Sequence, residues 1–513
     1  MAKIERTRNA TRNIAFGMIL RTYQILVPFL MRTAMIYLMG IEYLGLNSLF
    51  TSVLQVLNLA ELGVGSAMVF SMYKPIAIDD HITICALMRL YRMYYRVIGM
   101  VIAVVGLLLT PVIPKLINGD LPPELNVYIL YLLNLAVTVL SYWLFAYKNS
   151  LLQAYQRVDV TSKITLITVT IQYGLQFLVI VTIKNYYFYV LAALTTQALT
   201  NIATAIVVEK MFPQYHPIGK LPPNQIKNIN HRIRDLFTSK LGGVIVNSAD
   251  TVVISAFLGL TTLAIYQNYY YILTSIIGFV GIIFQSCTAG IGNSVIMESE
   301  EKNFADLKKF TFLISWIAGF CTCCFICLYQ PFMELWVGKD LMLKFTAVIC
   351  FSSYYFIYEI NQLLNTYKDA AGIWHEDRFR PLVTAIANLT MNLIMVQFWG
   401  IYGVLLSTSL SMLFVGMPWL LHNLFTALFE KSQMGGYLKE LLKYTLVVVI
   451  SCVVCYALSA VVHFSAFGNL IYRAIICAVV PNLIYFVFYR KTIEFVQCVQ
   501  LVEKMTKNKL HLN

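Results

Sequence analysis

Two arginines in the first apolar segment are the residues of this sequence best suited to specific chemistry. The stretch from Gly17 to Gly40 reads GMILRTYQILVPFLMRTAMIYLMG, which is long and apolar enough to cross a bilayer, yet it contains Arg21 and Arg32. An arginine near the bilayer centre costs on the order of 2.5–3.5 kcal/mol, so it rarely faces lipid. Eleven residues are about three helical turns, so both arginines project from nearly the same face. Guanidinium groups placed in this way suit an anion, above all the oxygens of a phosphate group.

A second basic face opens the third apolar segment. Arg89, Arg92 and Arg96 follow one another at the i, i+3 and i+7 spacing of one helix face. Neither arginine of the first segment has a carboxylate in its own helix to pair with. We therefore expect Arg21, Arg32, Arg89 and Arg92 to contact an anionic ligand, with Arg21 and Arg32 as the strongest candidates.

The elements that carry these residues are predicted to be membrane-spanning helices. The chain has 513 residues, of which 59% are hydrophobic and only 12% charged, and no soluble fold hides that much apolar surface. Apolar segments of roughly 20 residues recur along the whole chain, which is the length needed to span a bilayer. We predict an all-α polytopic membrane protein with about fourteen spans, near 13–39, 45–72, 86–112, 125–147, 163–183, 187–210, 237–259, 264–296, 309–330, 342–366, 380–398, 401–425, 441–463 and 468–489.

The charge pattern predicts the topology. Basic residues gather in alternate loops, including Lys148 and Arg157 after the fourth span and Arg378 and Arg380 after the tenth. The positive-inside rule then places both termini in the cytoplasm. The net charge of +13 therefore lies in the loops on one side, so we expect no nucleic-acid partner. A polar segment rich in proline separates two six-span halves, which predicts four parts: 1–212, a linker at 213–235, 236–430, and two further spans with a tail at 431–513.

Short glycine motifs relate the two halves. The second span ends in GVGSAMV, which contains Gly63 and Gly65, and the eighth ends in GIGNSVI, which contains Gly290 and Gly292. Equal span counts and these matching motifs favour a duplicated six-helix unit. Because six spans return the chain to the same side, the repeats would be parallel, with a pseudo-two-fold axis along the membrane normal. The glycines would permit close helix approach or gating, and simple helix packing explains them equally well.

Three of the carboxylates within the predicted spans are candidates for ion coupling. Asp250, Glu61 and Glu359 could couple transport to H⁺ or Na⁺, or could form interhelix salt bridges; Asp250 in particular could pair with Arg32. The cysteine tract CTCCFIC from Cys321 to Cys327 has no histidine or carboxylate within it, so we expect helix packing there and no metal site. No phosphate loop and no nucleophile elbow occurs in the sequence. We therefore predict no catalytic residues, no resident cofactor and no enzymatic activity.

Three segments carry a resemblance to a known family. GIEYLGLNSLFTSVLQVLNLAELGVGSAMVFSMYKPIA from Gly40 to Ala77 and NSADTVVISAFLGLTTLAIYQNYYYI from Asn247 to Ile272 resemble the two half signatures of the Wzx-type polysaccharide flippases. DAAGIWHEDRFRPLVTAIANLTMNLIMVQFWGIYGVLLSTSLS from Asp369 to Ser411 is similar to a third. This family belongs to the multidrug/oligosaccharidyl-lipid/polysaccharide exporter superfamily.

The resemblance implies a flippase of the bacterial plasma membrane. Its cargo would be an undecaprenyl-pyrophosphate-linked oligosaccharide for capsule, exopolysaccharide or O-antigen synthesis, moved by alternating access through a cationic cavity, with a polysaccharide polymerase as a partner. The alternatives are a lipid II flippase or a cation-coupled multidrug exporter of the same superfamily, although cationic drugs would require an acidic cavity. A membrane polymerase is disfavoured, because none of the outer loops exceeds roughly 15 residues and an active site there would need catalytic acids.

Overall fold

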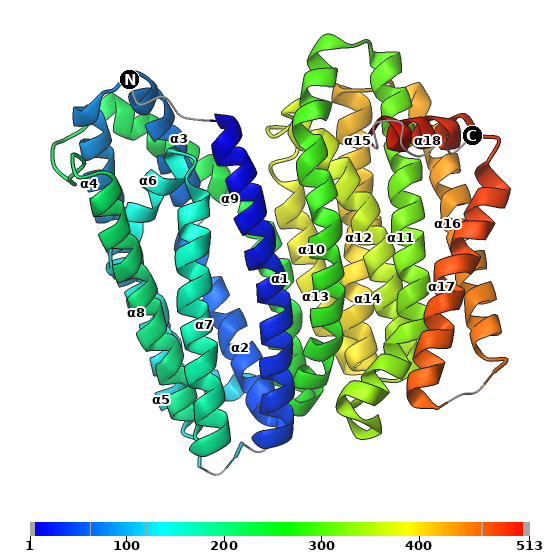
Figure 1. Ribbon diagram of the computed structural model, residues 1–513, viewed down its shortest axis with the longest axis horizontal. Coiled ribbons are helices and arrows are strands. Elements are labelled where there is room, and N and C mark those ends of the chain that lie inside the picture. The colour runs from blue at the N-terminus through cyan, green and yellow to red at the C-terminus, as the bar shows by residue number, and fades with distance from the viewer. Residues whose placement is uncertain (1–5, 62, 119–120, 123, 463–464, 506–513) are drawn as a thin grey trace. The chain divides into compact units, whose positions relative to one another are not determined.

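The chain folds into helices throughout the part that the structure describes. The structure is a computed structural model that describes residues 6–61, 63–118, 121–122, 124–462 and 465–505, in which every regular element is a helix (Figure 1). The predicted all-α polytopic fold is therefore confirmed. Contacts divide the chain into two compact units, Met1–Ala264 (unit 1) and Ile265–Asn513 (unit 2), and each is described by itself.

Unit 1 contains nine α-helices and the short helices that join or break them. Their bounds are α1 (Arg6–Leu38), α2 (Ile41–Leu57), η1 (Asn58–Glu61), α3 (Val64–Ala77), α4 (His81–Leu109), η2 (Thr110–Leu116), α5 (Val127–Trp143), η3 (Ala146–Lys148), α6 (Asn149–Ala154), α7 (Val158–Thr182), α8 (Tyr186–Met211) and α9 (Pro223–Leu258). Helix α1 packs along α7, α7 along α8, α4 along α5, and α2 along α9. The polar segment 213–235, expected as a linker, is thus helical from Pro223 onward, while the predicted domain bounds stay a prediction.

In unit 1, one residue explains where α4 begins and another explains how closely α2 packs. Asp80 caps α4, because its carboxylate accepts hydrogen bonds from the Thr83 N–H at 3.0 Å and the Thr83 hydroxyl at 2.6 Å. These bonds lower the pKa of Asp80. Gly45 lets α2 approach the backbone at Leu260, since a Cβ at Gly45 would lie 2.3 Å from the Leu260 carbonyl oxygen.

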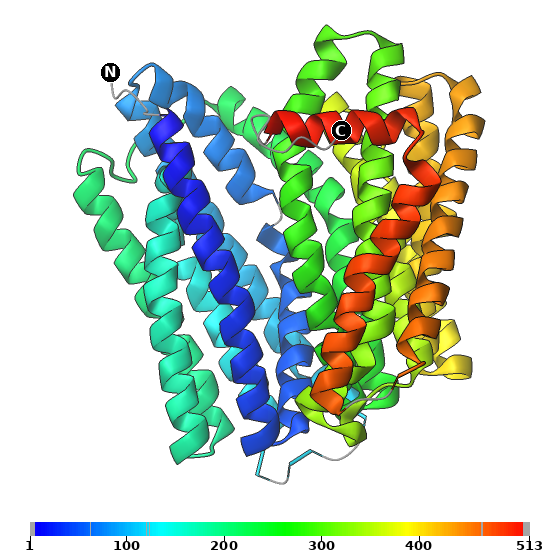
Figure 2. The same ribbon diagram turned by 45° about the vertical axis from the view of Figure 1, so that its right-hand side comes forward.

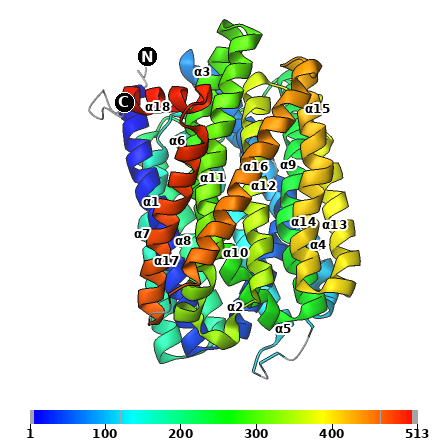
Figure 3. The ribbon, with the colours of Figure 1, turned by 90° about the vertical axis from the view of Figure 1, so that its right-hand side faces the viewer.

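Unit 2 is built around one long helix. Its elements are α10 (Leu260–Met297, which begins at the end of unit 1), α11 (Glu300–Val337), η4 (Lys339–Leu341), α12 (Phe345–Ala371), α13 (Arg380–Trp399), α14 (Ile401–Ser411), the π-helical η5 (Met412–Gly416), α15 (Met417–Ala427), α16 (Lys431–Ser459), α17 (Ala466–Tyr489) and α18 (Ile493–Met505). Helix α11 packs against α12, α16 and α17, which run alongside one another in Figure 3. The last helix, α18, crosses the others of unit 2 (red in Figure 2) and also contacts α11.

Small residues let the last two long helices pack closely on α11. A Cβ at Gly319 would lie 2.7 Å from a methyl group of Val448 on α16 and 2.9 Å from the Tyr485 hydroxyl on α17. Nearby, Cys323 and Cys327 of α11 are buried against Cys477 of α17 and other apolar side chains. Free thiols in such a position act as small hydrophobic side chains.

Most of the expected spans fall on helices that are long and apolar enough to cross a membrane. Within the described residues, ten helices are long and apolar enough to cross a membrane, and eleven if the bent pair α5 and α6 forms one span. The other expected spans also fall on helices, namely α1, α2 with α3, and α12.

Candidate functional site

The two arginines of α1 lie on the helix as their spacing predicts. Arg21 is exposed, and among the described residues its guanidinium has no ion-pair partner. Arg32 is half-buried and lies within electrostatic range of Tyr189 on α8. Both belong to a helix with Pro28 inside it. Arg21 therefore carries a charge that no described residue neutralises through an ion pair, whereas Arg32 is half-buried and lies near Tyr189.

The arginines of α4 are engaged with nearby groups. Arg89 donates a hydrogen bond from Nη1 to the carbonyl oxygen of Gly219 at 2.9 Å, which ties α4 to the loop before α9. The Arg92 guanidinium carbon lies 5.9 Å from the ring centroid of Tyr147 in η3. Arg96, one turn further along, is exposed. Since α1 packs mainly against α7 and α2, and α4 against α3 and α5, the two arginine pairs form two separate basic faces of unit 1.

A buried lysine at a helix break was not recognised from the sequence as a site residue. Helices α5 and α6 are bent by 47° around η3, and Phe145 there has a φ of 56°. Lys148, at the end of η3, is 6% exposed and forms a short ion pair with Glu209 of α8. No glycine or proline in the local sequence signals this break.

The first glycine motif coincides with a break between α2 and α3. Gly63 has a φ of +88°, a left-handed conformation that favours glycine, and a Cβ there would lie 2.6 Å from the Leu236 Cβ on α9. A Cβ at Gly65 would lie 3.0 Å from both a Glu61 carboxylate oxygen and the Tyr91 hydroxyl. Glu61 accepts a hydrogen bond from Tyr95 at 3.1 Å. The missing side chains at Gly63 and Gly65 thus make room for α9 and for a hydrogen-bonded carboxylate.

The other candidate carboxylates and glycines lie in different surroundings. Asp250 is buried on α9, with 8% of its surface exposed. Glu359 is fully buried on α12, and neither of its carboxylate oxygens has a hydrogen-bond partner among the described residues. In the second glycine motif, a Cβ at Gly292 would lie 3.3 Å from the Ala370 carbonyl oxygen, whereas a Cβ at Gly290 would meet open space.

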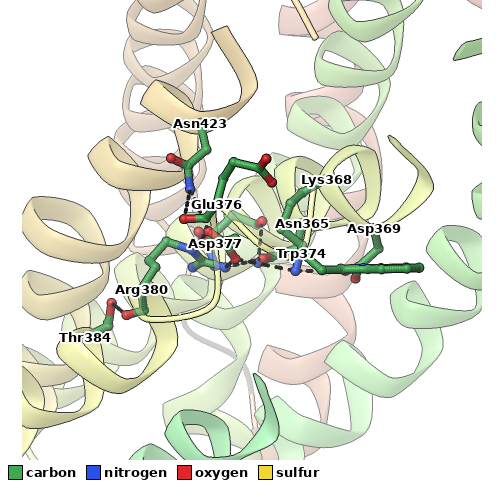
Figure 4. A network of polar contacts seen from close by, with 10 residues as sticks. Asn365, Lys368, Asp369, Trp374, Glu376, Asp377, Arg380, Thr384 and Asn423 are labelled. Carbon is green, nitrogen blue, oxygen red and sulfur yellow. Dashed lines mark hydrogen bonds and ion pairs between the residues drawn. The ribbon is translucent and has the colours of Figure 1, made fainter. Parts of the chain in front are cut away.

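Unit 2 contains a polar network around a buried carboxylate that the sequence analysis did not identify as a site (Figure 4). Arg380 donates two hydrogen bonds to Asp377, from Nε at 2.6 Å and from Nη2 at 2.8 Å. Its Nη2 also donates to Asn365 at 2.7 Å, and Asn423 donates to Asp377 at 3.1 Å. Lys368 lies 3.5 Å from the same carboxylate. We call Asn365, Lys368, Asp377, Arg380 and Asn423 the Asp377 cluster.

Unit 1 contains a second buried carboxylate that was missed, Asp159, at the start of α7. Arg157, Arg12 of α1 and Lys163 all lie within 4 Å of it, and its side chain is fully buried. We call Arg12, Arg157, Asp159 and Lys163 the Asp159 cluster. Among the residues that the structure describes, neither this cluster nor any other group of histidine, cysteine and carboxylate side chains has the arrangement of a metal site.

The fold is similar to those of several solved membrane transport proteins. The chain is similar to the lipid II flippase MurJ in its inward closed conformation, with a TM-score of 0.64 and 16% identity over 94% of this chain and 100% of that one. It is also similar to a multidrug resistance MATE family transporter of the MOP superfamily in its inward-facing conformation, with a TM-score of 0.59 and 14% identity over 82% of this chain and 99% of that one. A mutant of the Vibrio cholerae MATE transporter VcmN matches with a TM-score of 0.55 and 15% identity over 82% and 97% of the two chains.

These similarities establish the fold class at the level of architecture. Identities of 14–16% show a shared fold and nothing finer. No protein-family profile and no curated protein sequence matches the chain. The chain is therefore a multi-pass membrane protein with the fold of MOP-type flippases and transporters, and the three structures named above are those of transport proteins.

Proposed function

We propose that this chain is a flippase that moves a polyprenyl-pyrophosphate-linked oligosaccharide across the bacterial plasma membrane by alternating access. The oligosaccharide would serve capsule, exopolysaccharide or O-antigen synthesis. The observation that carries the proposal is the pair of arginines on α1, of which Arg21 is exposed and has no ion-pair partner among the described residues. A fold shared with a lipid II flippase supports a lipid-linked cargo.

The arginine chemistry fits the head of such a cargo. A pyrophosphate presents several oxygens in a small volume, and a guanidinium group can donate two parallel hydrogen bonds to them. In this proposal Arg21 and Arg32 contact the pyrophosphate. Arg89 and Arg92 lie on a separate basic face, so they would contact the cargo only in another state of the alternating-access cycle. Arg89 would have to exchange its hydrogen bond to Gly219 for the ligand.

Coupling to an ion gradient is part of the same proposal. A carboxylate that is buried without hydrogen bonds is costly as an anion, so it must take up a proton or a cation. Glu359 meets this description among the described residues. We propose Glu359 as the first candidate for H⁺ or Na⁺ coupling, ahead of Asp250 and Glu61, since Glu61 already accepts a hydrogen bond from Tyr95.

The orientation and the partner follow from the charge pattern and the cargo. We propose that both termini lie in the cytoplasm, because the basic loops alternate with loops that carry few basic residues. A polysaccharide polymerase on the outer side would then receive the translocated unit.

A lipid II flippase is the second candidate. The similarity to MurJ over 94% of this chain favours it, and lipid II also carries a pyrophosphate that the arginines would suit. A multidrug exporter is disfavoured, although MATE transporters share the fold, because arginines on α1 and α4 repel cationic drugs.

The test is a lipid analysis of a strain that lacks the protein. A complete oligosaccharide on a polyprenyl pyrophosphate should accumulate on the cytoplasmic face, and its mass would identify the cargo. Accumulation of lipid II would instead support the second candidate. A complete unit on the outer face that fails to lengthen would indicate a polymerase, and an unchanged lipid pool would contradict both flippase assignments.

Removal of one arginine should reproduce the deletion. Loss of a charged hydrogen bond to phosphate costs about 1.5–3 kcal/mol, so Arg21→Ala should lower export about 10- to 100-fold at equal protein abundance. Arg21→Lys should restore part of the export if charge alone matters, and little if a bidentate contact is needed. Arg490→Ala, which removes an exposed arginine stacked on Phe486 at the end of α17, is the matched control and should leave export unchanged.

A further inference from the structure

The Asp159 cluster brings three cations to one carboxylate. Arg157 donates from Nε to Oδ1 at 2.9 Å and from Nη2 to Oδ2 at 3.3 Å. Arg12 reaches Oδ2 from α1 at 2.9 Å, and Lys163, one turn along α7, lies 3.8 Å from it. No second carboxylate among the described residues lies within ion-pair distance of these three cations. One negative charge therefore holds three positive charges together.

Burial differs sharply between the carboxylate and its cations. The Asp159 side chain is 0% exposed, whereas the side chains of Arg12, Arg157 and Lys163 are 35%, 25% and 40% exposed. Each guanidinium has five donors, and the contacts to Asp159 use only one or two of them. The cluster thus presents an excess of two positive charges outward, on side chains whose positions are fixed by a buried anion.

An apolar stripe begins next to these cations. Lys163, Ile167 and Ile171 are spaced at i, i+4 and i+8, so they lie on one face of α7. The side chains of Ile167 and Ile171 are 62% and 42% exposed. The ring of Phe16 on α1 lies 4.2 Å from the Lys163 ammonium, which brings an aromatic surface to the same place.

The cluster lies where α7 would enter the membrane. Helix α7 is one of the candidate spans, and Asp159 is its second residue. Basic side chains at the end of a span reach the level of the lipid phosphates, while the residues further along the helix face acyl chains. A positively charged head region that continues into an exposed apolar stripe matches the chemistry of one ligand class, a lipid with a phosphate head.

We propose that the Asp159 cluster is a binding site for the phosphate head of a membrane lipid. Arg12, Arg157 and Lys163 would contact the phosphate oxygens, Asp159 would position the three cations, and the lipid chain would run along Ile167 and Ile171. Both a phospholipid and a polyprenyl diphosphate carry the required head and tail. The site does not depend on the cargo proposed above.

Lipid titration of the purified full-length protein in detergent tests the site. Binding would be measured by native mass spectrometry with phosphatidylglycerol, with polyprenyl diphosphate, and with phosphatidylcholine, whose head has no net charge. We expect phosphatidylglycerol or polyprenyl diphosphate to bind at least about tenfold more tightly than phosphatidylcholine, which corresponds to about 1.4 kcal/mol. Preference for phosphatidylglycerol would identify a bulk phospholipid as the ligand. Preference for polyprenyl diphosphate would identify the polyprenyl carrier lipid as the ligand.

Two variants and one control locate the binding. Arg12→Gln and Lys163→Gln should each weaken the preferred lipid about tenfold, because each removes one charged contact to phosphate. Lys163 is the most exposed of the three cations, so Lys163→Gln keeps the test open if Arg12→Gln fails to fold. Arg378→Gln removes one exposed charge from the corresponding loop of unit 2 and should bind lipid as the wild type does. Equal binding by wild type and Lys163→Gln, or no preference over phosphatidylcholine, would overturn the proposal.

Discussion

The Asp159 cluster of unit 1 and the Asp377 cluster of unit 2 both pair a buried carboxylate with basic side chains, but they differ in charge balance and in exposure. Each occurs in the loop after the fourth predicted span of its half, and each keeps a carboxylate at 0% or 2% side-chain exposure. Around Asp377 the partners are one arginine, one lysine and an amide, and the lysine is shared with Asp369. The three described ion-pair partners of Asp159 are Arg12, Arg157 and Lys163. The charges of the described residues therefore balance around Asp377 and Asp369, whereas the Asp159 cluster has two more positive charges than negative ones.

The difference in exposure has an energetic consequence. Arg380 and Lys368 are 8% and 13% exposed, so few water molecules can reach them if Asp377 is removed. The cations around Asp159 are 25–40% exposed and can be hydrated without it. The comparison indicates that the Asp377 cluster serves stability, while the Asp159 cluster is free to serve an anionic ligand.

Removal of the carboxylate of unit 2 should have the largest effect on stability. Breaking a buried ion pair by removing one partner costs about 3–5 kcal/mol, because the other charge stays buried, and we expect Asp377→Ala to lose that amount. The measurement is the free energy of unfolding in mixed micelles, titrated with SDS. Asp369→Ala is the control: Asp369 is 49% exposed and pairs with the same lysine, so the loss should stay below about 1 kcal/mol. Similar losses in the two variants would contradict a stabilising role specific to Asp377.

Removal of the carboxylate of unit 1 should cost less. Asp159→Ala leaves three cations that can be hydrated, so we expect a loss of about 1.5–3 kcal/mol, the range for a hydrogen bond to a charged group. The same SDS titration measures it. If Asp159→Ala were as destabilising as Asp377→Ala, the greater exposure of the cations around Asp159 would not lower the cost of removing its carboxylate, which would contradict the comparison.

The sequence predicted most of the helices and little of the two clusters. Apolar segments identified the helices because span length and composition are local properties. The Lys163–Asp159 and Asp377–Arg380 pairs also have the i, i+4 and i, i+3 spacing of local ion pairs. Arg12 and Asn423, by contrast, reach Asp159 and Asp377 from helices distant in the sequence, so only packing brings them there.

Of the two helix breaks in unit 1 discussed above, one has a local sequence signal and the other depends on tertiary packing. The break between α2 and α3 lies at Gly63, within the segment 45–72 that was predicted as one span. The glycine is a local signal for a break, and its left-handed φ shows why glycine is favoured there. The bend between α5 and α6 occurs at Phe145, in a stretch without glycine or proline, and it buries Lys148 against Glu209 of α8. The bend therefore depends on packing between distant parts of the chain. From the local sequence alone, Lys148 could be recognised only as a basic loop residue.

A matched pair of lysine variants tests the comparison most directly, and one of them, Lys163→Gln, should have the smallest effect. Lys163 and Lys368 each lie within 4 Å of the buried carboxylate of their own unit, at 3.8 Å and 3.5 Å. Because Lys163 is 40% exposed and two arginines also neutralise Asp159, Lys163→Gln should change the free energy of unfolding by less than about 1 kcal/mol. Lys368→Gln should cost more, about 1.5–3 kcal/mol, since this nearly buried ammonium contacts two carboxylates. A larger loss in Lys163→Gln than in Lys368→Gln would reverse the comparison, because it would make the cations of unit 1 structural and leave no surplus charge for a lipid phosphate.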